Sequence, residues 1–288
     1  MINLWYDEHA YDYLQGKMSG PPKVRLNLKK SLEESNIKYV VNQDVYEKNF
    51  ILEYGVNLYK IHEKLEHQSC FIGPHFWPFE PYGKFLVDNP QYYNQLIAPS
   101  MWVKNKLINK FNVNHNKISI WPVGIEGFDV NKNITYDCLI YFKRRSNEEL
   151  KECIRFLEKY NLSYEIIYYG NYDENTFHSL LSGAKFCFLL NGTESQGIAV
   201  QEIMLSNTPL FVWDVREWVD QGEEYKVPAT SVPYWSNECG KIFYDVTDMD
   251  IAFSEFYAKI DEYNSKKYVD RELSFEESVK KLMEIIND

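Results

Sequence analysis

Short apolar runs alternate with amphipathic segments along most of the chain. Apolar runs bounded by polar turns are typical of the buried strands of a parallel sheet, while apolar residues three or four positions apart indicate helices. The alternation therefore predicts an α/β protein built from βαβ units. The predicted strands are 2–6, 38–41, 69–73, 95–99, 117–121, 137–141, 164–169, 186–190, 210–213 and 241–244.

Capping residues and helix breakers mark the ends of the predicted helices. Ser100 is a candidate N-cap for a helix over 101–111, and Asn207 with Pro209 ends the helix that begins near Gly197. The segment 226–240 is rich in proline and polar residues, and we expect it to be irregular. The predicted helices are 24–36, 101–111, 147–160, 175–182, 197–206 and 275–286.

The charge balance, the cysteines and the length of the apolar runs limit the functions and cellular locations that we expect. Acidic residues outnumber basic ones by 42 to 31, which argues against broad nucleic-acid binding because that function usually needs a basic face. The five cysteines form no C-x-x-C motif, and Cys138 and Cys187 lie in apolar runs as expected for buried free thiols. The first residues do not resemble a signal peptide, and no apolar run approaches the ~20 residues of a membrane span. We therefore expect a soluble, cytoplasmic protein with no transmembrane segment.

The segment 191–213 carries the strongest chemical signal, because a polar loop there joins a buried strand to a helix. The start of a helix presents unpaired N–H groups and a positive dipole, which favour phosphate. Glu194 lies in the loop, and Glu202 lies in the helix about 7.5 Å along the axis from Gly197. One carboxylate can then bind a nucleotide's ribose while the helix start binds its phosphates. The alternative is an exposed loop glutamate and a helix-face glutamate of any α/β domain.

This pattern resembles the E-x7-E signature of the retaining GT-B glycosyltransferases, especially glycosyltransferase family 4, and reads Glu194-SQGIAVQ-Glu202 here. The segment 96–126 also resembles that family, although Glu126 stands where the family has aspartate. The resemblance implies two Rossmann-like domains facing across a cleft, with a reduced N-terminal domain. The implied divisions are an acceptor-side domain at 1–126, a hinge at about 124–134, a nucleotide-sugar domain at 134–262, and a C-terminal helix in 263–288 that crosses back.

The resemblance implies a glycosyltransferase of glycan biosynthesis, either a hexosyltransferase or a pentosyltransferase. It would move a sugar from a UDP-type or GDP-type nucleotide diphosphate sugar to a glycan or other hydroxyl acceptor, with retention at the anomeric carbon. Neither a metal nor another cofactor is expected, because such enzymes bind the donor through protein cations and the chain has no D-x-D motif around Asp214 and Asp220. Two alternatives stay open, namely a nucleotide-sugar epimerase of the same fold and a non-catalytic sugar-binding protein.

The resemblance also assigns roles in the second domain. Glu194 would contact the hydroxyls of the donor sugar, and Glu202 would contact the ribose. Two cations would bind the diphosphate, and the family usually provides them in an R-x4-K spacing. That spacing is absent here, so we favour the adjacent Lys143 and Arg144, with Arg145 as a third candidate. The other candidates for donor binding are Tyr172, which would stack on the base, and the residues at the helix start, Ser195, Gln196, Gly197 and Ile198.

Two further candidates lie in the first domain. Gly20 follows the first predicted strand in a Gly-Pro turn, where the resemblance places the diphosphate or the acceptor. His75 follows the strand 69–73 and would contact the donor sugar, although a packed loop histidine is an equal alternative. The aromatic residues Trp77, Phe79 and Tyr82 are candidates for stacking on a sugar ring.

Overall fold

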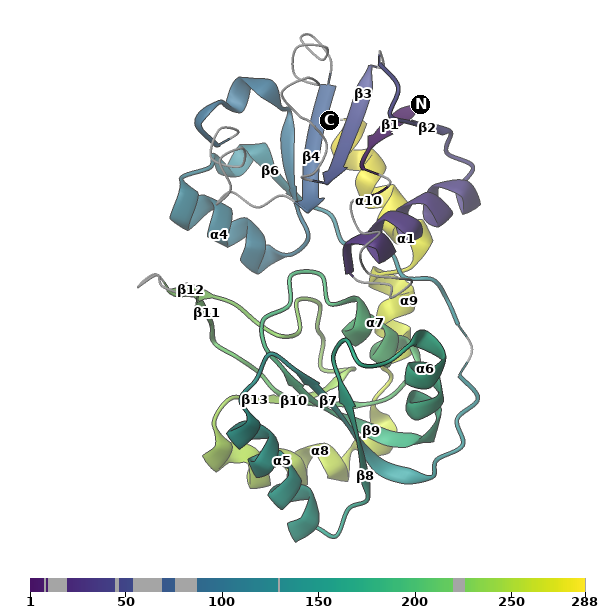
Figure 1. Cartoon of the computed structure of the whole chain (residues 1–288). Coiled ribbons are helices and arrows are strands. Elements are labelled where there is room, and N and C mark those ends of the chain that lie inside the picture. Colours follow the sequence, from purple (N-terminus) through teal and green to yellow (C-terminus); the bar gives the residue numbers. More distant parts are fainter. Residues whose placement is uncertain are drawn as a thin grey trace. The chain divides into compact units, whose positions relative to one another are not determined.

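The computed structural model describes residues 1–7, 9, 20–44, 47–53, 69–75, 87–128, 130–219 and 226–287. The chain divides into two compact units. Unit 1 comprises Met1–Glu126 and Leu273–Asp288, and unit 2 comprises Gly127–Glu272. Each unit contains a parallel sheet with helices packed against it (Figure 1), so each is a Rossmann-like domain.

Unit 1 has a six-stranded sheet in the order β2-β1-β3-β4-β5-β6, and all its strand pairs are parallel. The strand order reverses between β1 and β3. The strands are β1 (Ile2–Trp5), β2 (Tyr39–Val41), β3 (Lys48–Glu53), β4 (Ser69–His75), β5 (Gln95–Ala98) and β6 (Ile118–Ile120). The helical segments described in this unit are α1 (Gly20–Glu34), η2 (Pro90–Tyr92), α4 (Met101–Phe111), η3 (His115–Lys117) and α10 (Phe275–Asn287).

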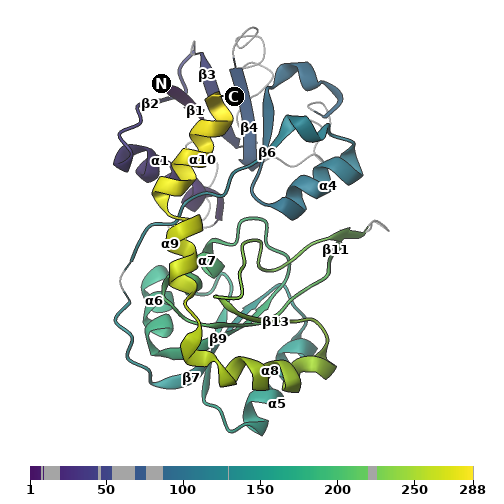
Figure 2. The same cartoon turned by 180° about the vertical axis from the view of Figure 1, so that it is seen from behind.

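Helix α10 belongs to unit 1 although its sequence follows all of unit 2. It packs against α1, as Figure 2 shows from behind. The indole of Trp121 donates a hydrogen bond of 3.0 Å to the carbonyl of Ser278, and the Ser278 hydroxyl donates one of 2.9 Å to the carbonyl of Pro122. Leu282 is fully buried on the same helix. The amphipathic pattern at 275–286 thus forms the predicted helix, and its apolar face completes the core of unit 1.

Unit 2 has a five-stranded parallel sheet in the order β13-β10-β9-β7-β8. Its strand order reverses between β7 and β9, which is the usual location of a ligand in a doubly wound sheet. The strands are β7 (Tyr136–Lys143), β8 (Tyr164–Tyr168), β9 (Ala184–Asn191), β10 (Leu210–Trp213) and β13 (Gly240–Phe243). A separate antiparallel pair consists of β11 (Glu217–Val219) and β12 (Lys226–Pro228).

Helices cover both faces of the second sheet. On one face, α5 (Asn147–Lys159) and α8 (Met249–Ala258) enclose a core made largely of phenylalanine rings. On the other face, α6 (Glu174–Gly183) contacts the sheet through Phe177, whose ring lies 6.0 Å from that of Tyr141. Helix α7 (Ile198–Leu205) packs against α9 (Ser265–Glu272). The phenylalanines of the core are Phe156, Phe186, Phe188, Phe211, Phe243, Phe253 and Phe256.

Every predicted strand and helix is present, but the structure adds elements and changes some bounds. Helix α1 begins at Gly20, earlier than predicted, because prolines in a first turn sacrifice no intrahelical hydrogen bond. Strand β3 was not predicted, since its apolar run is short and flanked by charged residues. Helices α8 and α9 were also not predicted.

One local prediction needs correction, and another is confirmed in position but not in its hydrogen bond. The segment 226–240 is not wholly irregular, because its first residues form β12 with Val227 buried and Pro228 at the strand end, where a missing N–H is tolerated. Ser100 occupies the N-cap of α4, but its side chain makes no capping hydrogen bond. Among the described helices, none has the length and apolar character needed to cross a membrane.

Candidate functional site

The loops after β7 and β9 meet at the point where the strand order of unit 2 reverses. Lys143 and Asn191 end these two strands and are register partners. The N–H of Gly192 then donates a hydrogen bond of 2.8 Å to the carbonyl of Lys143. Because both strands are parallel, their following loops share one edge of the sheet. This edge carries Glu194 and the three adjacent cations Lys143, Arg144 and Arg145.

Glu194 is buried at this edge, with only 9% of its surface exposed. Its carboxylate forms an ion pair with the ammonium of Lys143 and accepts a hydrogen bond of 2.9 Å from the side-chain amide of Asn191. The Lys143 ammonium also lies 4.1 Å from the centre of the Tyr169 ring, a cation–π contact. Glu194 is therefore not the exposed loop glutamate of the alternative interpretation.

Asp214, which follows β10, organises the loop behind Glu194. Its carboxylate accepts hydrogen bonds from the hydroxyls of Thr230 and Ser231 and from the Ser231 N–H, each at 2.7 Å. The carbonyl of Thr230 in turn accepts a hydrogen bond of 3.0 Å from the N–H of Glu194. Asp214 thus fixes the backbone that carries Glu194. The other aspartate considered as a metal ligand, Asp220, lies outside the described residues.

Helix α7 begins directly after this loop. Gly197 is its N-cap and has a φ of 69°, a left-handed conformation that favours glycine. It offers no side chain to cap the helix, so the α7 N–H groups that a capping residue would bind face the loop. Gln196 and Ile198 are buried and Ser195 is half-buried. The four predicted residues therefore lie at a helix start whose N–H groups can bind an anion.

Glu202 is also buried, with 6% of its surface exposed, and lies within α7. The Nε2 atom of His178, on α6, is 3.8 Å from its Oε1 atom. The His178 ring stacks on that of Phe128, with ring centres 4.1 Å apart and planes within 10° of parallel. No sequence pattern selects His178 or Phe128, because the contact of His178 with Glu202 and its stacking on Phe128 arise only from packing.

Tyr172 lies within electrostatic reach of both glutamates. Burial is the main cause that raises its pKa to about 12, and the negative charges of Glu202 and Glu194 contribute to the rise. Its hydroxyl is 3.3 Å from that of Tyr141, and its ring lies 5.1 Å from that of Phe177. The predicted base-stacking residue is thus at the site, with one side of its ring packed against α6.

The three adjacent cations differ in their surroundings. Arg145 is 7% exposed in its side chain, pairs with Glu149, and donates hydrogen bonds to the carbonyls of Asn191 at 3.2 Å and Trp213 at 2.8 Å. Arg144 is exposed, with a φ of 52°. Lys143 is the partner of Glu194. Arg145 therefore connects strand ends within the protein, whereas Lys143 is held by Glu194 and Arg144 is exposed to solvent.

Several buried polar atoms of unit 2 have no hydrogen-bond partner among the described residues. They include Nε2 of His178, Oδ1 of Asn191 and Oε1 of Gln201. All three belong to residues around the loop that carries Glu194 or the helix that carries Glu202. Buried polar atoms usually have partners, so such a cluster indicates a place where a polar ligand or water binds.

The two candidates from the first domain lie in unit 1. Gly20 is the exposed first residue of α1, and a side chain there would meet no described atom within 4 Å, so nothing in the described structure requires glycine. His75 ends β4, and its Nδ1 atom is buried without a described partner. Burial, followed by the charge of Arg25, lowers the pKa of His75 to about 4. The candidates Trp77, Phe79 and Tyr82 lie outside the described residues.

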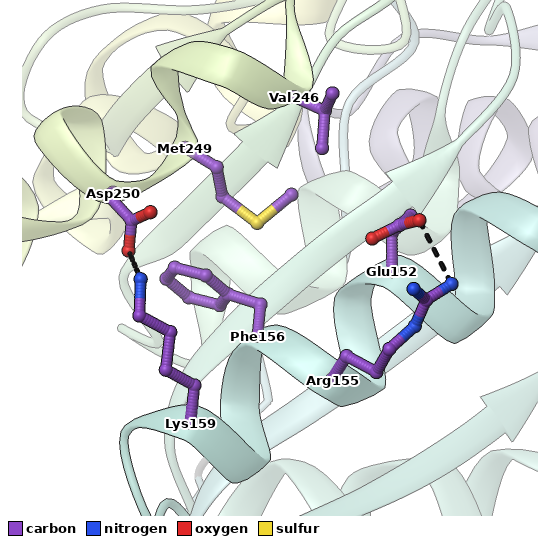
Figure 3. A pocket seen from close by; sticks show the side chains of 7 residues that line it. All are labelled: Glu152, Arg155, Phe156, Lys159, Val246, Met249 and Asp250. Atoms are coloured by element: carbon purple, nitrogen blue, oxygen red, sulfur yellow. Dashed lines mark hydrogen bonds and ion pairs between the residues drawn. The ribbon is translucent and has the colours of Figure 1, made fainter.

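A hollow elsewhere on unit 2 contains none of the candidate residues. It opens beside the phenylalanine core between α5 and the start of α8 (Figure 3). Lys159 pairs with Asp250 at 2.6 Å, and Arg155 pairs with Glu152 at 2.9 Å. The charged side chains that line the hollow therefore neutralise one another. Its lining residues are Glu152, Arg155, Phe156, Lys159, Val246, Met249 and Asp250.

Comparison with known proteins identifies the fold. The sequence matches no protein-family model and no curated protein. Among solved structures, the lipopolysaccharide outer core galactosyltransferase WaaB matches with a TM-score of 0.62 at 11% identity, over 99% of this chain and 98% of that one. The chain has the GT-B fold. The prediction of an α/β protein with two Rossmann-like domains is therefore confirmed.

Two further GT-B structures extend this likeness. Sucrose-phosphate synthase from Thermosynechococcus elongatus matches with a TM-score of 0.58 at 11% identity, over 99% of this chain and 98% of that one. A mutant of S. aureus TarM, in complex with Fondaparinux, alpha-GlcNAc-glycerol and UDP, matches with a TM-score of 0.58 at 14% identity. That match covers 92% of this chain but only 59% of TarM. At these identities the likeness concerns the fold alone.

Proposed function

We propose that the chain is a glycosyltransferase that moves a sugar from a nucleotide diphosphate sugar, of the UDP or GDP type, to the hydroxyl group of a glycan acceptor. The observation that carries this proposal is the arrangement at the strand ends of unit 2. A buried Glu194 is paired with Lys143 before an uncapped helix start, and a second buried glutamate, Glu202, follows in that helix. Solved GT-B structures that resemble the chain include a galactosyltransferase and a UDP complex, which supports the same reading.

Each group then has a role in transfer. Lys143, Arg144 and the N–H groups at the start of α7 would stabilise the negative charge that develops on the leaving diphosphate. Glu202 would accept hydrogen bonds from the ribose hydroxyls. Glu194 would accept them from the donor sugar, on the side of the phosphates away from the ribose. The residues Ser195, Gln196 and Ile198 would shape the diphosphate site, and Tyr172 would contact the base.

Retention at the anomeric carbon, without a covalent intermediate, belongs to the proposal. The carboxylate of Glu194 accepts a hydrogen bond from the side-chain amide of Asn191, which reduces its nucleophilicity. A retaining glycosidase instead needs two carboxyl groups about 5 Å apart with one free to attack. Attack by the acceptor on the face from which the diphosphate leaves requires no such pair. The anomer of the product, measured by NMR, tests this step.

Metal independence is the next part of the proposal. Lys143 and Arg144 provide the positive charge that a divalent ion would otherwise supply to the diphosphate. The proposal also assigns the enzyme to glycan biosynthesis in the cytoplasm. All five cysteines are buried and form no disulfide, which suits a reducing compartment.

A thermal-shift screen tests the proposal directly. UDP, GDP and ADP, and then their sugars, are added to the wild type and to Glu202→Gln. A ligand at 100 times its dissociation constant adds about 2.7 kcal/mol to the stability of the folded state. We expect one nucleoside diphosphate to raise the melting temperature of the wild type more than that of the variant. An Arg155→Ala variant, changed in the hollow of Figure 3, serves as the matched control.

Two results would contradict the proposal. If none of these nucleotides raises the melting temperature, the arrangement at Glu194 is not a nucleotide site. If the sugar nucleotide is converted to an isomer when no acceptor is present, the enzyme is an epimerase.

A further inference from the structure

The buried Nε2 atom of His178 faces the carboxylate of Glu202. Its Nε2 atom is buried, has no hydrogen-bond partner among the described residues, and is 3.8 Å from Oε1 of Glu202. The rest of the ring is partly open, since 32% of the side chain is exposed, compared with 8% for Glu202. The Nε2 atom of the imidazole is therefore buried, and it faces the glutamate.

Phe128 stabilises this orientation. Its ring stacks nearly parallel on that of His178 and limits rotation of the imidazole out of its plane. Phe128 itself precedes a segment that is tied to the end of α6. Within that segment, the N–H of Asn133 donates to the carbonyl of Ser182 at 3.1 Å, and the ammonium of Lys132 donates to the carbonyl of Leu181 at 2.8 Å.

We propose that His178 is a positioning residue for nucleotide binding. Its Nε2–H would donate a hydrogen bond to one carboxylate oxygen of Glu202 and leave the other oxygen directed at the ribose hydroxyls. This inference rests on the proposed function, because it takes the ribose to be the ligand of Glu202. The present separation exceeds a hydrogen bond by about 1 Å, a gap that rotation of the carboxylate closes when the ribose binds.

The chemistry requires no charge on the histidine. A neutral imidazole carries one N–H donor, which is sufficient for this bond. If His178 served only in apolar packing, any aromatic ring could replace it. Its buried Nε2 atom would then make no hydrogen bond, which is uncommon for a buried polar atom. The two interpretations differ in the role of the Nε2 atom. A substitution that removes this nitrogen but keeps a ring stacked on Phe128 therefore separates them.

The experiment measures the affinities of UDP and 2′-deoxy-UDP, or of GDP and 2′-deoxy-GDP if the guanine nucleotide binds more tightly. His178→Phe keeps a ring on Phe128 but removes the N–H, while His178→Gln offers an amide donor. Glu202→Gln changes the proposed partner. His115→Gln, at an exposed histidine of unit 1, is the matched control. Circular dichroism and a thermal melt establish that each variant is folded.

We expect the wild type and the control to prefer the ribonucleotide by about tenfold, the size of a hydrogen bond to a charged group. His178→Phe should lose most of that preference while its affinity for the deoxynucleotide changes by less than about twofold. His178→Gln should recover part of the preference. The double variant of His178→Phe and Glu202→Gln should lose no more than Glu202→Gln alone, because the two residues act as one unit.

An equal loss of affinity for both nucleotides in His178→Phe would overturn the inference and leave a packing role. So would an unchanged preference, or a wild type that binds both nucleotides equally well, although nucleotide binding would then still support the proposed function. A wild type that binds neither UDP nor GDP would instead refute the proposed function and this inference with it.

Discussion

Lys143 and Glu194 neutralise each other at the carboxyl end of the second sheet, where each side chain is only 11% exposed. The same ammonium is the one proposed to bind the diphosphate. A diphosphate that binds there competes with Glu194 for Lys143, and the carboxylate gains freedom to accept hydrogen bonds from the donor sugar. Under the proposed function, the pair would couple occupation of the phosphate site to the state of the sugar site.

The first prediction concerns Glu194→Gln. We expect sugar transfer to fall by at least about 100-fold, the effect of removing one electrostatic contact to a transition state. The amide can still accept the Asn191 hydrogen bond, so the fold should persist, with a loss of about 1–3 kcal/mol because Lys143 is left without a counter-charge. A coupled assay for the released nucleotide and a urea titration measure the two effects. Wild-type turnover in this variant would remove Glu194 from the mechanism.

The second prediction separates the cations. Lys143→Ala and Arg144→Ala should each weaken binding of the nucleoside diphosphate by about tenfold or more, because each loses a charge-assisted contact. Arg144→Ala should not change the melting temperature, since Arg144 is exposed. Titration calorimetry measures affinity, and Lys151→Ala on the exposed face of α5 is the control. Unchanged affinity in both variants would place the phosphates elsewhere.

The third prediction assigns Arg145 to stability. Arg145→Lys keeps the charge but cannot reach Glu149 and the carbonyls of Asn191 and Trp213 together. We expect a loss of about 1–3 kcal/mol in the free energy of unfolding, measured in urea. Nucleotide affinity of the folded variant should stay within about twofold of the wild type. A large loss of affinity with unchanged stability would show that Arg145 binds phosphate instead.

The fourth prediction follows from His75. The pKa of His75 is lowered in the folded protein from 6.5 to about 4. Between these two pH values, His75 is therefore protonated in the unfolded chain but neutral in the folded protein. The stability contribution of neutral His75 is therefore present above pH 6.5 and is lost as the pH falls towards 4, by roughly 3 kcal/mol in total. Urea titrations across this window should show a smaller pH dependence for His75→Gln than for the wild type. The exposed-site variant His115→Gln is the control, and equal slopes for all three proteins would contradict the prediction.

The fifth prediction is that a chelator leaves transfer intact. The positive charges of Lys143 and Arg144 would serve the diphosphate in place of a metal ion, and Asp214 already accepts hydrogen bonds from Thr230 and Ser231. Initial rates in EDTA should equal those in buffer with added magnesium. A strict requirement for a divalent ion would disprove metal-independent transfer.

Sequence patterns predicted those parts of the site that depend on strand ends. A buried run followed by a polar loop and a helix was enough to locate Glu194 and Gly197, and the run before Lys143 identified the facing loop. Both inferences are local, because an element's boundary follows from its own residues. The β7/β9 reversal then brings the two loops together, and parallel βαβ units lead to that arrangement.

The remaining features depend on contacts that are distant in sequence. Arg145 is indistinguishable from its neighbours until the carbonyl of Trp213, 68 positions away, is seen to accept its hydrogen bond. His178 is an unremarkable helix residue until α6 is packed beside α7 and Phe128 lies on its ring. Such roles are set by tertiary packing rather than by periodicity or spacing, so no pattern in a single sequence predicts them.

Unit 1 consists of two separate chain segments because it includes helix α10, whereas unit 2 consists of one segment. The indole of Trp121, in the first segment of unit 1, donates its hydrogen bond to a carbonyl of α10. That helix follows all of unit 2 in the sequence. Unit 2 can therefore reach its final packing without α10, whereas the core of unit 1 stays incomplete until that helix packs against it. A chain cut after Glu272 would contain every residue of unit 2 and would lack part of the core of unit 1.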